Sequence, residues 1–536
     1  MRISTEVSTE VSTEAPGTLA DLVRAAAKAR PHATALRSGE EALTFGALRE
    51  AVLATARRLR HHAPPADGTA ALLFENTPEC AVAFLAAAYT GTRLVPLEPD
   101  TGEDRLLALR RELGPLTVIG HEAKLRALRL SPGDRGAASA DRWQGGGLLP
   151  VEEPPGGAPA PRSDDAPPTA AGPDAPFLYQ YTSGSTGEPK AAVHSQRDLV
   201  HGGEIYAHTY GITAADRILA AVPLLHSFGM VAGLVTALYT GAELVLPGRF
   251  VPAKLLRTVR EQACTVLVTT PLACDLLARS AAADRERPPL PGSLRLCLSS
   301  GAALPAPVAD RFREHCGPVV QQVYGSTEAG IIAAQRVEDE GADRGVGSPV
   351  RGVRIRLVDE RGQDVPPGAT GSLWVRTPAM FTHYLDRPEP TGQAFRDGWY
   401  VTGDMARTDS EGRLHLVGRK DSFINVGGKK VNPTEVEEVL LAHPAVAEAV
   451  VWGERAEHGA DADGVSERVR ATVVARAPLS AADLAAHCRG RLLPHQVPGG
   501  VEFVASLPKS ALGKIRRAAV ADAAARKETT GGAAGD

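Results

Sequence analysis

The chain has 536 residues, more than a single hydrophobic core usually holds, so its length predicts two or more domains. Hydrophobic residues make up 43% and charged residues 23%, which is ordinary for a soluble globular protein. With 59 basic and 63 acidic side chains the net charge is −4, which disfavours nucleic acid or an anionic membrane as a bulk electrostatic partner.

The chain carries no signal for a membrane span or for secretion. It has no run of about 18 apolar residues, and its N-terminus lacks an apolar signal region. The cysteines are scattered without a CxxC pair, so we expect buried, reduced thiols and a cytoplasmic location. They are Cys80, Cys264, Cys274, Cys297, Cys316 and Cys488.

Both ends of the chain are of low complexity. Residues 3–15 read ISTEVSTEVSTEA, a repeat that cannot bury enough apolar surface to order itself. We therefore expect disordered tails over residues 1–17 and, at the small, Gly-rich end, over residues 524–536. A Pro/Gly/Ala-rich stretch at residues 132–175 predicts a surface loop or linker.

Between the tails, helical and strand-like patterns alternate. Apolar residues recur at helical spacing in Leu19–Ala29 and Leu48–Leu59. This alternation predicts an α/β fold with largely parallel sheets in a large N-terminal domain, residues 18–420. Short apolar runs predict buried strands at Ala70–Phe74, Leu94–Leu97, Leu116–Ile119, Pro176–Tyr181, Ile218–Val222, Leu244–Leu246, Thr265–Thr269 and Leu294–Leu298.

The pattern changes after about residue 345. Arg354–Val358 and Ser372–Arg376 alternate with turn residues, which predicts a small β-subdomain. Residues 421–523 predict a small, mobile α+β domain. Its first helix has a start signal in which Asn432 caps, Pro433 follows and Glu435 stands three residues after the cap. Strands are expected at Ala447–Trp452 and Arg470–Ala475, and a helix is expected from Ser480.

A glycine- and hydroxyl-rich loop follows the strand predicted at Pro176–Tyr181. It reads YTSGSTGEPK, and its exposed N–H and hydroxyl groups suit the oxygens of a phosphate. Because Lys190 is followed by Ala191 and the glycine spacing differs, the loop is not a P-loop of the GxxxxGK[ST] kind. The candidate nucleotide-binding residues are Thr182, Ser183, Gly184, Ser185, Thr186, Gly187 and Lys190.

With four further strings in the same order, this loop resembles the adenylate-forming superfamily of acyl-CoA synthetases, peptide-synthetase adenylation domains and beetle luciferases. The resemblance covers about residues 18–523. It implies ATP and Mg²⁺ as cofactors. The further strings are VYGSTEAG (residues 323–330), GWYVTGDMA (398–406), GRKDSFINVGGKKVNPTEVE (418–437) and LPKSALGKIRR (507–517).

In the first of these strings, the resemblance assigns Tyr324 to the adenine and Thr327 to a phosphate oxygen, and Gly325 is a further candidate for nucleotide binding. It assigns Glu328, with Thr186 of the loop, to Mg²⁺. An aromatic ring suits a purine, and a carboxylate suits a hard cation that bridges phosphates.

In the later strings, the resemblance assigns Asp404 to the two ribose hydroxyls and Arg419 to the ribose or a phosphate. Asp421 is the expected hinge of the C-terminal domain. Lys514 is expected to bind the carboxylate and the α-phosphate during adenylation. An ionised carboxylate has two oxygens for two hydroxyl donors, which agrees with the role of Asp404.

Two segments resemble the acyl pocket of the superfamily, PLLHSFGM (residues 223–230) and LSSGAALP (298–305). His226 is a candidate for substrate contact or for a gating or core role, and Gly301 and Ala302 are candidates for nucleotide contact. Relatives that activate α-amino acids have an Asp where Ser227 stands here. We therefore expect an aryl, arylacrylic or aliphatic acid, as in acyl- and aryl-CoA ligases.

The nucleophile stays open at this point. The main hypothesis is a thiol, either coenzyme A or the phosphopantetheine of a carrier protein. The alternative is a nitrogen nucleophile, an amine or nitrite, in bacterial specialised metabolism. An oxygenase of the luciferase kind is a further possibility. A non-catalytic AMP-binding protein is disfavoured because Lys514, Glu328 and Asp404 are all present. The expected assembly is a monomer or a homodimer.

The role assigned to Lys514 predicts a selective loss. Lys514→Ala removes a positive charge from the meeting of two anions, so acid-dependent ATP–pyrophosphate exchange should fall at least about 100-fold. Transfer from pre-made acyl-adenylate to the nucleophile should be largely spared. Exchange at the wild-type rate would contradict the assignment.

Overall fold

The computed structural model describes residues 17–62, 68–128, 147–151, 172–182, 189–283, 290–336, 345–426, 429–461, 464–509, 515–517, 519–521 and 523. Residues 1–16 and 524–536 of the predicted tails lie outside these residues, as do most of the Pro-rich stretch, Ser183 to Gly187 of the phosphate loop and Lys514.

The chain divides into two compact units. The first comprises residues 1–342, 347–354 and 375–400, and the second comprises residues 343–346, 355–374 and 401–536. The predicted α/β class is confirmed, with a large N-terminal part built on parallel sheets and a smaller C-terminal part. The predicted domain limits at residues 17/18, 420/421 and 523/524 stay predictions.

Two large sheets form the first unit. Among the described residues, one has nine strands in the order β15 (Ser348–Pro349), β14 (Gly330–Ala334), β13 (Val320–Ser326), β12 (Leu296–Ser299), β11 (Val266–Thr269), β9 (Arg217–Ala220), β10 (Glu243–Val245), β1 (Thr34–Ser38) and β2 (Glu41–Thr44). The other has seven, in the order β18 (His383–Tyr384), β8 (Lys190–Ser195), β7 (Pro176–Thr182), β4 (Arg93–Leu97), β3 (Thr69–Leu73), β5 (Leu116–Gly120) and β6 (Leu148–Pro150).

Most pairings in these two sheets are parallel. They run from β1 through β10, β9, β11 and β12 to β13 in one sheet. In the other they run from β6 through β5, β3 and β4 to β7. Every residue of β3, β5 and β11 is buried, which explains why these strands read as continuous apolar runs in the sequence.

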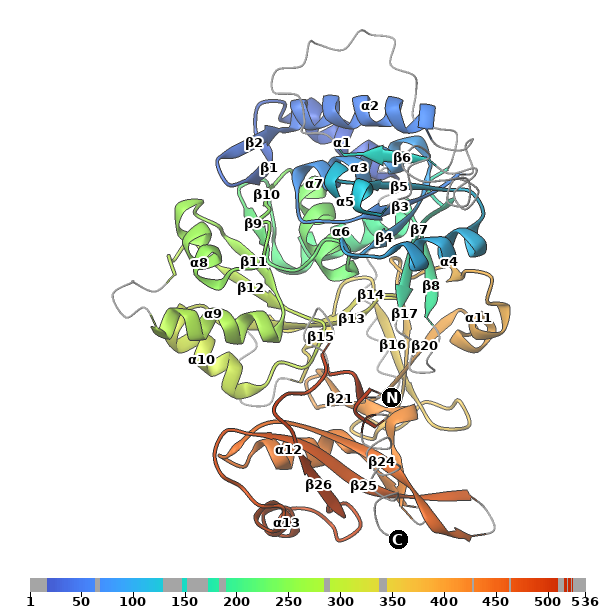
Figure 1. Ribbon diagram of the computed structural model, residues 1–536, viewed down its shortest axis with the longest axis vertical. Helices are drawn as coiled ribbons and strands as arrows, with labels where there is room; N and C mark the ends of the chain where they lie inside the picture. Colours follow the sequence, from blue (N-terminus) through green and yellow to red (C-terminus); the bar gives the residue numbers. More distant parts are fainter. Residues whose placement is uncertain are drawn as a thin grey trace. The chain divides into compact units, whose positions relative to one another are not determined.

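Helices cover and separate the two sheets (Figure 1). α3 contacts β1 of one sheet and β3 and β4 of the other, and α6 contacts β14, β7 and β8. The helices of this unit are α1 (Leu19–Ala29), α2 (Phe45–His62), α3 (Pro78–Thr90), α4 (Glu103–Leu113), α5 (Glu122–Ala127), α6 (Gln196–Tyr210), the π-helix η2 (Gly229–Val235), α7 (Thr236–Thr240), α8 (Pro252–Glu261), α9 (Pro271–Ala283), α10 (Ala306–Cys316) and α11 (Pro388–Ala394).

The outer helices complete two apolar cores. Leu255 of α8, Leu277 of α9 and Phe312 of α10 pack in one buried cluster with Leu219 of β9 and Leu267 of β11. A second cluster joins the strands of the seven-stranded sheet to α4 and α5. The six cysteines are free and buried, which confirms the expectation from their apolar surroundings.

A further sheet lies within residues 354–419. Its order is β16 (Arg354–Val358), β17 (Gly371–Arg376), β20 (Trp399–Thr408) and β19 (Phe395–Arg396), and β21 (Leu414–Arg419) also pairs with β20. β16 and β17 confirm the strands that the sequence predicts in this region.

The rest of the second unit is α+β. After the 3₁₀ turn η3 (Lys420–Ser422) come β22 (Ile424–Val426), β23 (Lys429–Val431), α12 (Pro433–Leu441), β24 (Val446–Asp461), β25 (Gly464–Ala475), α13 (Ala481–Arg489) and β26 (Gly500–Phe503). β24, β25 and β26 form one sheet. Its core packs Val436 and Leu440 of α12 and Leu484 of α13 against Val451 and Val473.

The hairpin of β13 and β14 is irregular next to the VYGSTEAG motif. The register shifts between Tyr324 and Gly325, and Gly330 has a φ of +66°. A Cβ atom added to Gly325 would overlap the carbonyl oxygen of Gly330. Because that oxygen is backbone, the hairpin cannot yield by rotating a side chain, and position 325 requires glycine.

Gly325→Ala should therefore destabilise the first unit. We expect a loss of about 2 kcal/mol in the free energy of unfolding, since the new methyl group overpacks a backbone contact. Urea denaturation followed by circular dichroism measures it. Gly392→Ala is the control, because Gly392 lies in α11 with nothing within 4 Å of an added Cβ. Equal stability of the two variants would contradict the requirement.

Candidate active site

The site residues of the first unit lie at the carboxyl ends of adjacent parallel strands. His226 lies in the segment after β9, Gly301 and Ala302 follow β12, and Thr327 and Glu328 follow β13. In open α/β sheets, ligands bind in the crevice outside these ends. The pairing of β9, β11, β12 and β13 thus gathers segments that are a hundred residues apart in sequence.

The phosphate loop is held at both ends by strand pairing. Thr182, the last residue of β7, pairs with Lys190, the first residue of β8, and its Oγ1 donates to the Lys190 carbonyl over 3.3 Å. A short antiparallel base of this kind fixes where the loop leaves and re-enters the sheet. The predicted roles of Ser183, Gly184, Ser185, Thr186 and Gly187 stay predictions, because these residues lie outside the described part of the chain.

The VYGSTEAG motif forms the turn between β13 and β14. Tyr324 and Gly325 lie at the end of β13, and Thr327 and Glu328 lie in the turn itself. The turn is closed by the Ala329 N–H, which donates to Ser326 Oγ over 3.1 Å. Tyr324, Thr327 and Glu328 are all partly exposed, so each side chain has a surface on which a ligand can bind.

Glu328 is held by two contacts from one short segment. The Tyr384 hydroxyl donates to Glu328 Oε1 over 2.9 Å, and the Phe381 N–H donates to the Glu328 carbonyl over 2.7 Å. Lys190 Nζ lies 5.6 Å from the centroid of the Tyr384 ring, within the range of a cation–π contact. Tyr384 therefore links the phosphate-loop lysine to the carboxylate assigned to magnesium.

The acyl-pocket segment reaches the same motif. Ser227 Oγ donates to Thr327 Oγ1 over 3.5 Å, which is a long hydrogen bond. His226 Nε2 lies 3.8 Å from Glu98 Oε1, too far for a hydrogen bond, and it has no such partner among the described residues. Burial lowers the pKa of His226 to about 4, so the imidazole is neutral at pH 7. Burial, and then Asp100, raise the pKa of Glu98.

Two side-chain amides fix the backbone just before His226. Asn76 Nδ2 donates to the Val222 carbonyl over 2.9 Å, and its Oδ1 accepts from the Leu224 N–H over 2.7 Å. Gln180 of β7, which is buried, donates to the Leu225 carbonyl over 2.9 Å. Sequence reasoning missed both residues. Their partners are 146, 148 and 45 positions away, so no local pattern indicates these contacts.

The predicted ribose and hinge residues lie in the second unit. Asp404 of β20 pairs in register with Arg419 at the end of β21, and their nearest charged atoms are 3.8 Å apart. The Asp404 N–H donates to Thr402 Oγ1 over 3.0 Å. Asp421 lies in η3, directly after Arg419 and Lys420. The assigned roles of Asp404, Arg419 and Asp421 stay predictions.

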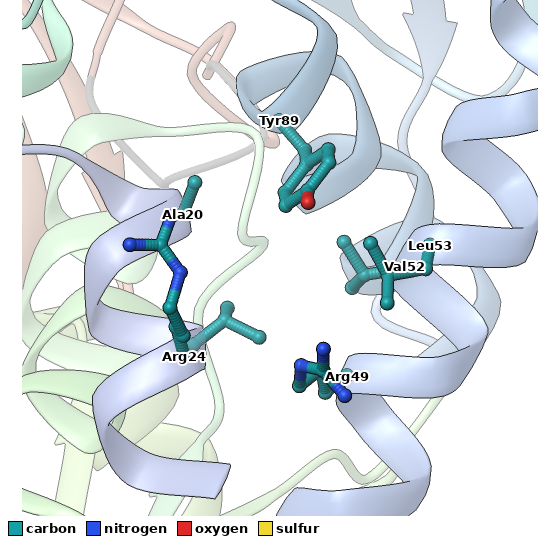
Figure 2. A pocket seen from close by; sticks show the side chains of 7 residues that line it. Ala20, Arg24, Arg49, Val52, Leu53 and Tyr89 are labelled. Carbon is teal, nitrogen blue, oxygen red and sulfur yellow. The ribbon is translucent and has the colours of Figure 1, made fainter. Parts of the chain in front are cut away.

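The pocket in Figure 2 lies apart from these motifs. It is formed by α1, α2 and α3, with the guanidinium groups of Arg24 and Arg49 at its edge and Tyr89 opposite Arg24. Its remaining lining residues are Ala20, Val23, Val52 and Leu53. None of them is a predicted site residue, so this pocket belongs to the packing of three helices rather than to the candidate active site.

Comparison with known families agrees with this arrangement. The sequence profile described as "AMP-binding enzyme" matches residues 23–385, and that of the "AMP-binding enzyme C-terminal domain" matches residues 435–514. The chain belongs to the AMP-binding enzyme family. The resemblance to the adenylate-forming superfamily, and within it to acyl- and aryl-CoA ligases, is thereby confirmed.

Individual members of the family match along almost the whole chain. An indoleacetate–CoA ligase of Aromatoleum aromaticum is 32% identical over 93% of this chain and 96% of its own length. A feruloyl-CoA synthase of an Amycolatopsis species is 31% identical over 92% and 96%, respectively. The solved structure of O-succinylbenzoate coenzyme A synthetase from Bacillus subtilis in complex with AMP has a TM-score of 0.78 and 27% identity, covering 93% of this chain and 97% of its own.

The residues of the AMP-binding motif fit a magnesium ion that is bound with a nucleotide. Mg²⁺ in such sites takes one or two protein carboxylates and completes its shell with phosphate oxygens and water. Glu328 provides a partly exposed carboxylate of fixed orientation. Within the described ranges, no cluster of three or more His, Cys, Asp or Glu side chains could hold a metal ion, so an all-protein metal cage is not what this part of the chain provides.

No helix among the described residues is both long and apolar enough to cross a membrane.

His226 predicts a pH dependence of stability. Its pKa is lowered in the folded state, so the unfolded chain binds its proton first as the pH falls below about 6.5, and stability is lost between about pH 6.5 and 4. Between pH 7 and 4.5, the free energy of unfolding of His226→Gln should fall by about 2 kcal/mol less than that of the wild type. Urea titrations at several pH values would measure this difference. His32→Gln, at an exposed position, is the control. Parallel stability curves for wild type and His226→Gln would contradict the prediction.

Proposed function

We propose that this chain uses ATP to convert a carboxylic acid into an acyl-adenylate and then transfers the acyl group to the thiol of coenzyme A. The predicted enzyme class, an AMP-forming acid–thiol ligase, is confirmed by relatives that are coenzyme A ligases over nearly their full length. The observation that carries the assignment to this site is the position of Glu328, in the family's AMP-binding motif and linked through Tyr384 to Lys190 of the phosphate loop.

The reaction has an electrostatic difficulty that these residues address. A carboxylate oxygen attacks the α-phosphorus of ATP, the bond to pyrophosphate breaks, and two anions meet while charge builds on the leaving group. Lys190 supplies a positive charge at the end of the phosphate loop. We propose that the loop's N–H and hydroxyl groups and Lys514 add donors and a second cation. A magnesium ion bound by Glu328 and Thr186 would neutralise phosphate charge.

Further residues are proposed to position the nucleotide. Tyr324 offers an aromatic face to the adenine, beside Gly325. Gly301, which has a φ of +90°, and Ala302 provide backbone at the end of β12. In the second unit, Asp404 would accept from the ribose hydroxyls, with Arg419 beside it. We propose that the C-terminal domain expected at residues 421–523 reorients about Asp421 between the two half-reactions.

For the acid, we propose an aryl, arylacrylic or aliphatic carboxylate rather than an α-amino acid. An α-ammonium group needs a carboxylate partner, and Ser227 stands where relatives that activate α-amino acids have an Asp. Ser227 is uncharged, and its hydroxyl donates to Thr327. The neutral imidazole of His226 is compatible with an apolar acyl group. Relatives named for indoleacetate and ferulate support an aryl or arylacrylic acid.

Further parts of the proposal go beyond what the relatives establish. We propose Mg²⁺ as the metal, a bacterial cytoplasmic setting in specialised metabolism, and a monomer or homodimer. The six free, buried cysteines support a reducing compartment. A carrier-protein thiol and a nitrogen nucleophile are the alternatives to coenzyme A that the experiment must separate.

Product analysis tests the proposed function. The purified chain is incubated with ATP, MgCl₂ and one acid at a time, together with coenzyme A, an amine, nitrite or a phosphopantetheinylated carrier protein. Mass spectrometry should find acyl-CoA, AMP and pyrophosphate with benzoic, cinnamic or indolic acids, and no product with α-amino acids. Glu328→Gln should lower the rate at least about 100-fold. An amide or nitrogen-linked product, or no AMP with any acid, would contradict the proposal.

A further inference from the structure

Tyr384 lies between the two groups of opposite charge that a nucleotide triphosphate needs. Its hydroxyl donates to Glu328 Oε1 over 2.9 Å, and its ring lies beneath Lys190 Nζ, 5.6 Å from the ring centroid. Within the part of the chain that the structure describes, Lys190 and Glu328 both contact Tyr384 and form no ion pair with each other. Each charge is therefore anchored to the same side chain without being neutralised by the other.

The backbone around Tyr384 is tied to both partners. Tyr384 is in β18, which pairs antiparallel with β8, the strand that begins at Lys190. The Leu385 N–H donates to the Ala191 carbonyl over 2.9 Å, and the Phe381 N–H donates to the Glu328 carbonyl over 2.7 Å. The segment from 381 to 385 thus spans from the end of the phosphate loop to the turn that carries Glu328.

An aromatic cluster fixes the orientation of the Tyr384 ring. The ring is largely buried and lies 4.8 Å from the ring of Phe381, which in turn lies 5.1 Å from Phe395 and 5.5 Å from Tyr400. Aromatic pairs at these separations pack with defined geometry. The Tyr384 ring is therefore held in a fixed orientation, and its hydroxyl donates to Glu328 from a fixed position. The hydrogen bond restricts the rotation of the Glu328 carboxylate before a ligand binds.

We propose that Tyr384 is a positioning residue that orients the Glu328 carboxylate for the metal bound with ATP and keeps the Lys190 ammonium available for the phosphates. The inference deepens the proposed function and rests on it. Partners that hydrogen-bond a metal-ligating carboxylate orient it, and their loss typically lowers metal affinity about 10- to 100-fold. A hydroxyl that donates to an anion also leaves its ring richer in electrons, which favours the cation above it.

Binding of ATP at graded MgCl₂ concentrations, without any acid, tests this role independently of turnover. Isothermal titration calorimetry of Tyr384→Phe should show the half-saturating Mg²⁺ concentration for ATP binding raised at least about tenfold. The affinity for metal-free ATP should be unchanged, because the Tyr384→Phe ring still lies under Lys190. Tyr239→Phe in α7 is the matched control, since the Tyr239 hydroxyl also faces a carboxylate, that of Glu204, in a helix that carries no motif residue. It should behave as wild type.

A double-mutant cycle separates positioning from general destabilisation. In the Glu328→Gln background, Tyr384→Phe should cause no further change in Mg²⁺ dependence, because the group through which it acts is gone. If thermal unfolding shows that Tyr384→Phe does not fold, Tyr384→Leu also removes the hydroxyl without adding volume to the buried cluster and should give the same rise. Wild-type Mg²⁺ dependence in a folded variant would overturn the inference. If wild type itself bound no ATP at any Mg²⁺ concentration, the proposed function would fail instead.

Discussion

The parallel pairing of β9, β11, β12 and β13 is the constraint on which the candidate active site depends. Parallel strands place their carboxyl ends at one edge of a sheet, so the segments after them meet there. His226, Gly301 and Glu328 come from three such segments, and none of them is near the others in sequence. The buried, continuous apolar strands hold this edge in place, and the chemistry is left to the loops.

A second requirement of the proposed site is that a cationic and an anionic side chain lie close together without forming an ion pair with each other. Lys190 and Glu328 are linked through Tyr384 rather than paired directly. The hydroxyl of Ser227 donates to Thr327, the residue before Glu328, and the neutral imidazole of His226 precedes Ser227 in the chain. Under the proposed function the charged groups serve the phosphates, and Ser227, which has no charge, is consistent with an acid that lacks an ammonium group.

Local patterns predicted the elements well, because their signals are short-range. Leu19–Ala29 has the predicted bounds, capped by Thr18 and Asp21, and Asn432 caps α12 by accepting from the Thr434 N–H. The reciprocal half of that cap is different. The Glu435 side chain accepts a hydrogen bond from Gln496, 61 residues away. This tertiary hydrogen bond replaces the one that a capping box would make with the backbone N–H of Asn432. Ser480 and Asp483, without such a competitor, form the complete box.

The contacts that orient the site residues could not be predicted from a local sequence pattern. Tyr384 is 56 positions from Glu328, and none of the strings quoted in the sequence analysis contains it. Asn76 and Gln180 are likewise isolated polar residues whose function appears only when the chain has folded. The nucleotide motifs could be recognised because they are contiguous strings, whereas the residues that orient them are spread over several strands and helices. The second unit also includes residues 401–420, which the sequence analysis assigned to the N-terminal domain. In this stretch β20 pairs with β21, and no local sequence pattern separates it from the residues before it.

The central claim is that a carboxylate oxygen becomes bonded to the α-phosphorus of ATP at this site. The most direct measurement uses an acid labelled with ¹⁸O in both carboxylate oxygens, in a reaction with ATP, MgCl₂ and coenzyme A. The account predicts that one ¹⁸O atom from each acid molecule is recovered in AMP by mass spectrometry, because the acyl–oxygen bond breaks when the thiol attacks. Recovery of unlabelled AMP, or of label in inorganic phosphate beside ADP, would contradict it.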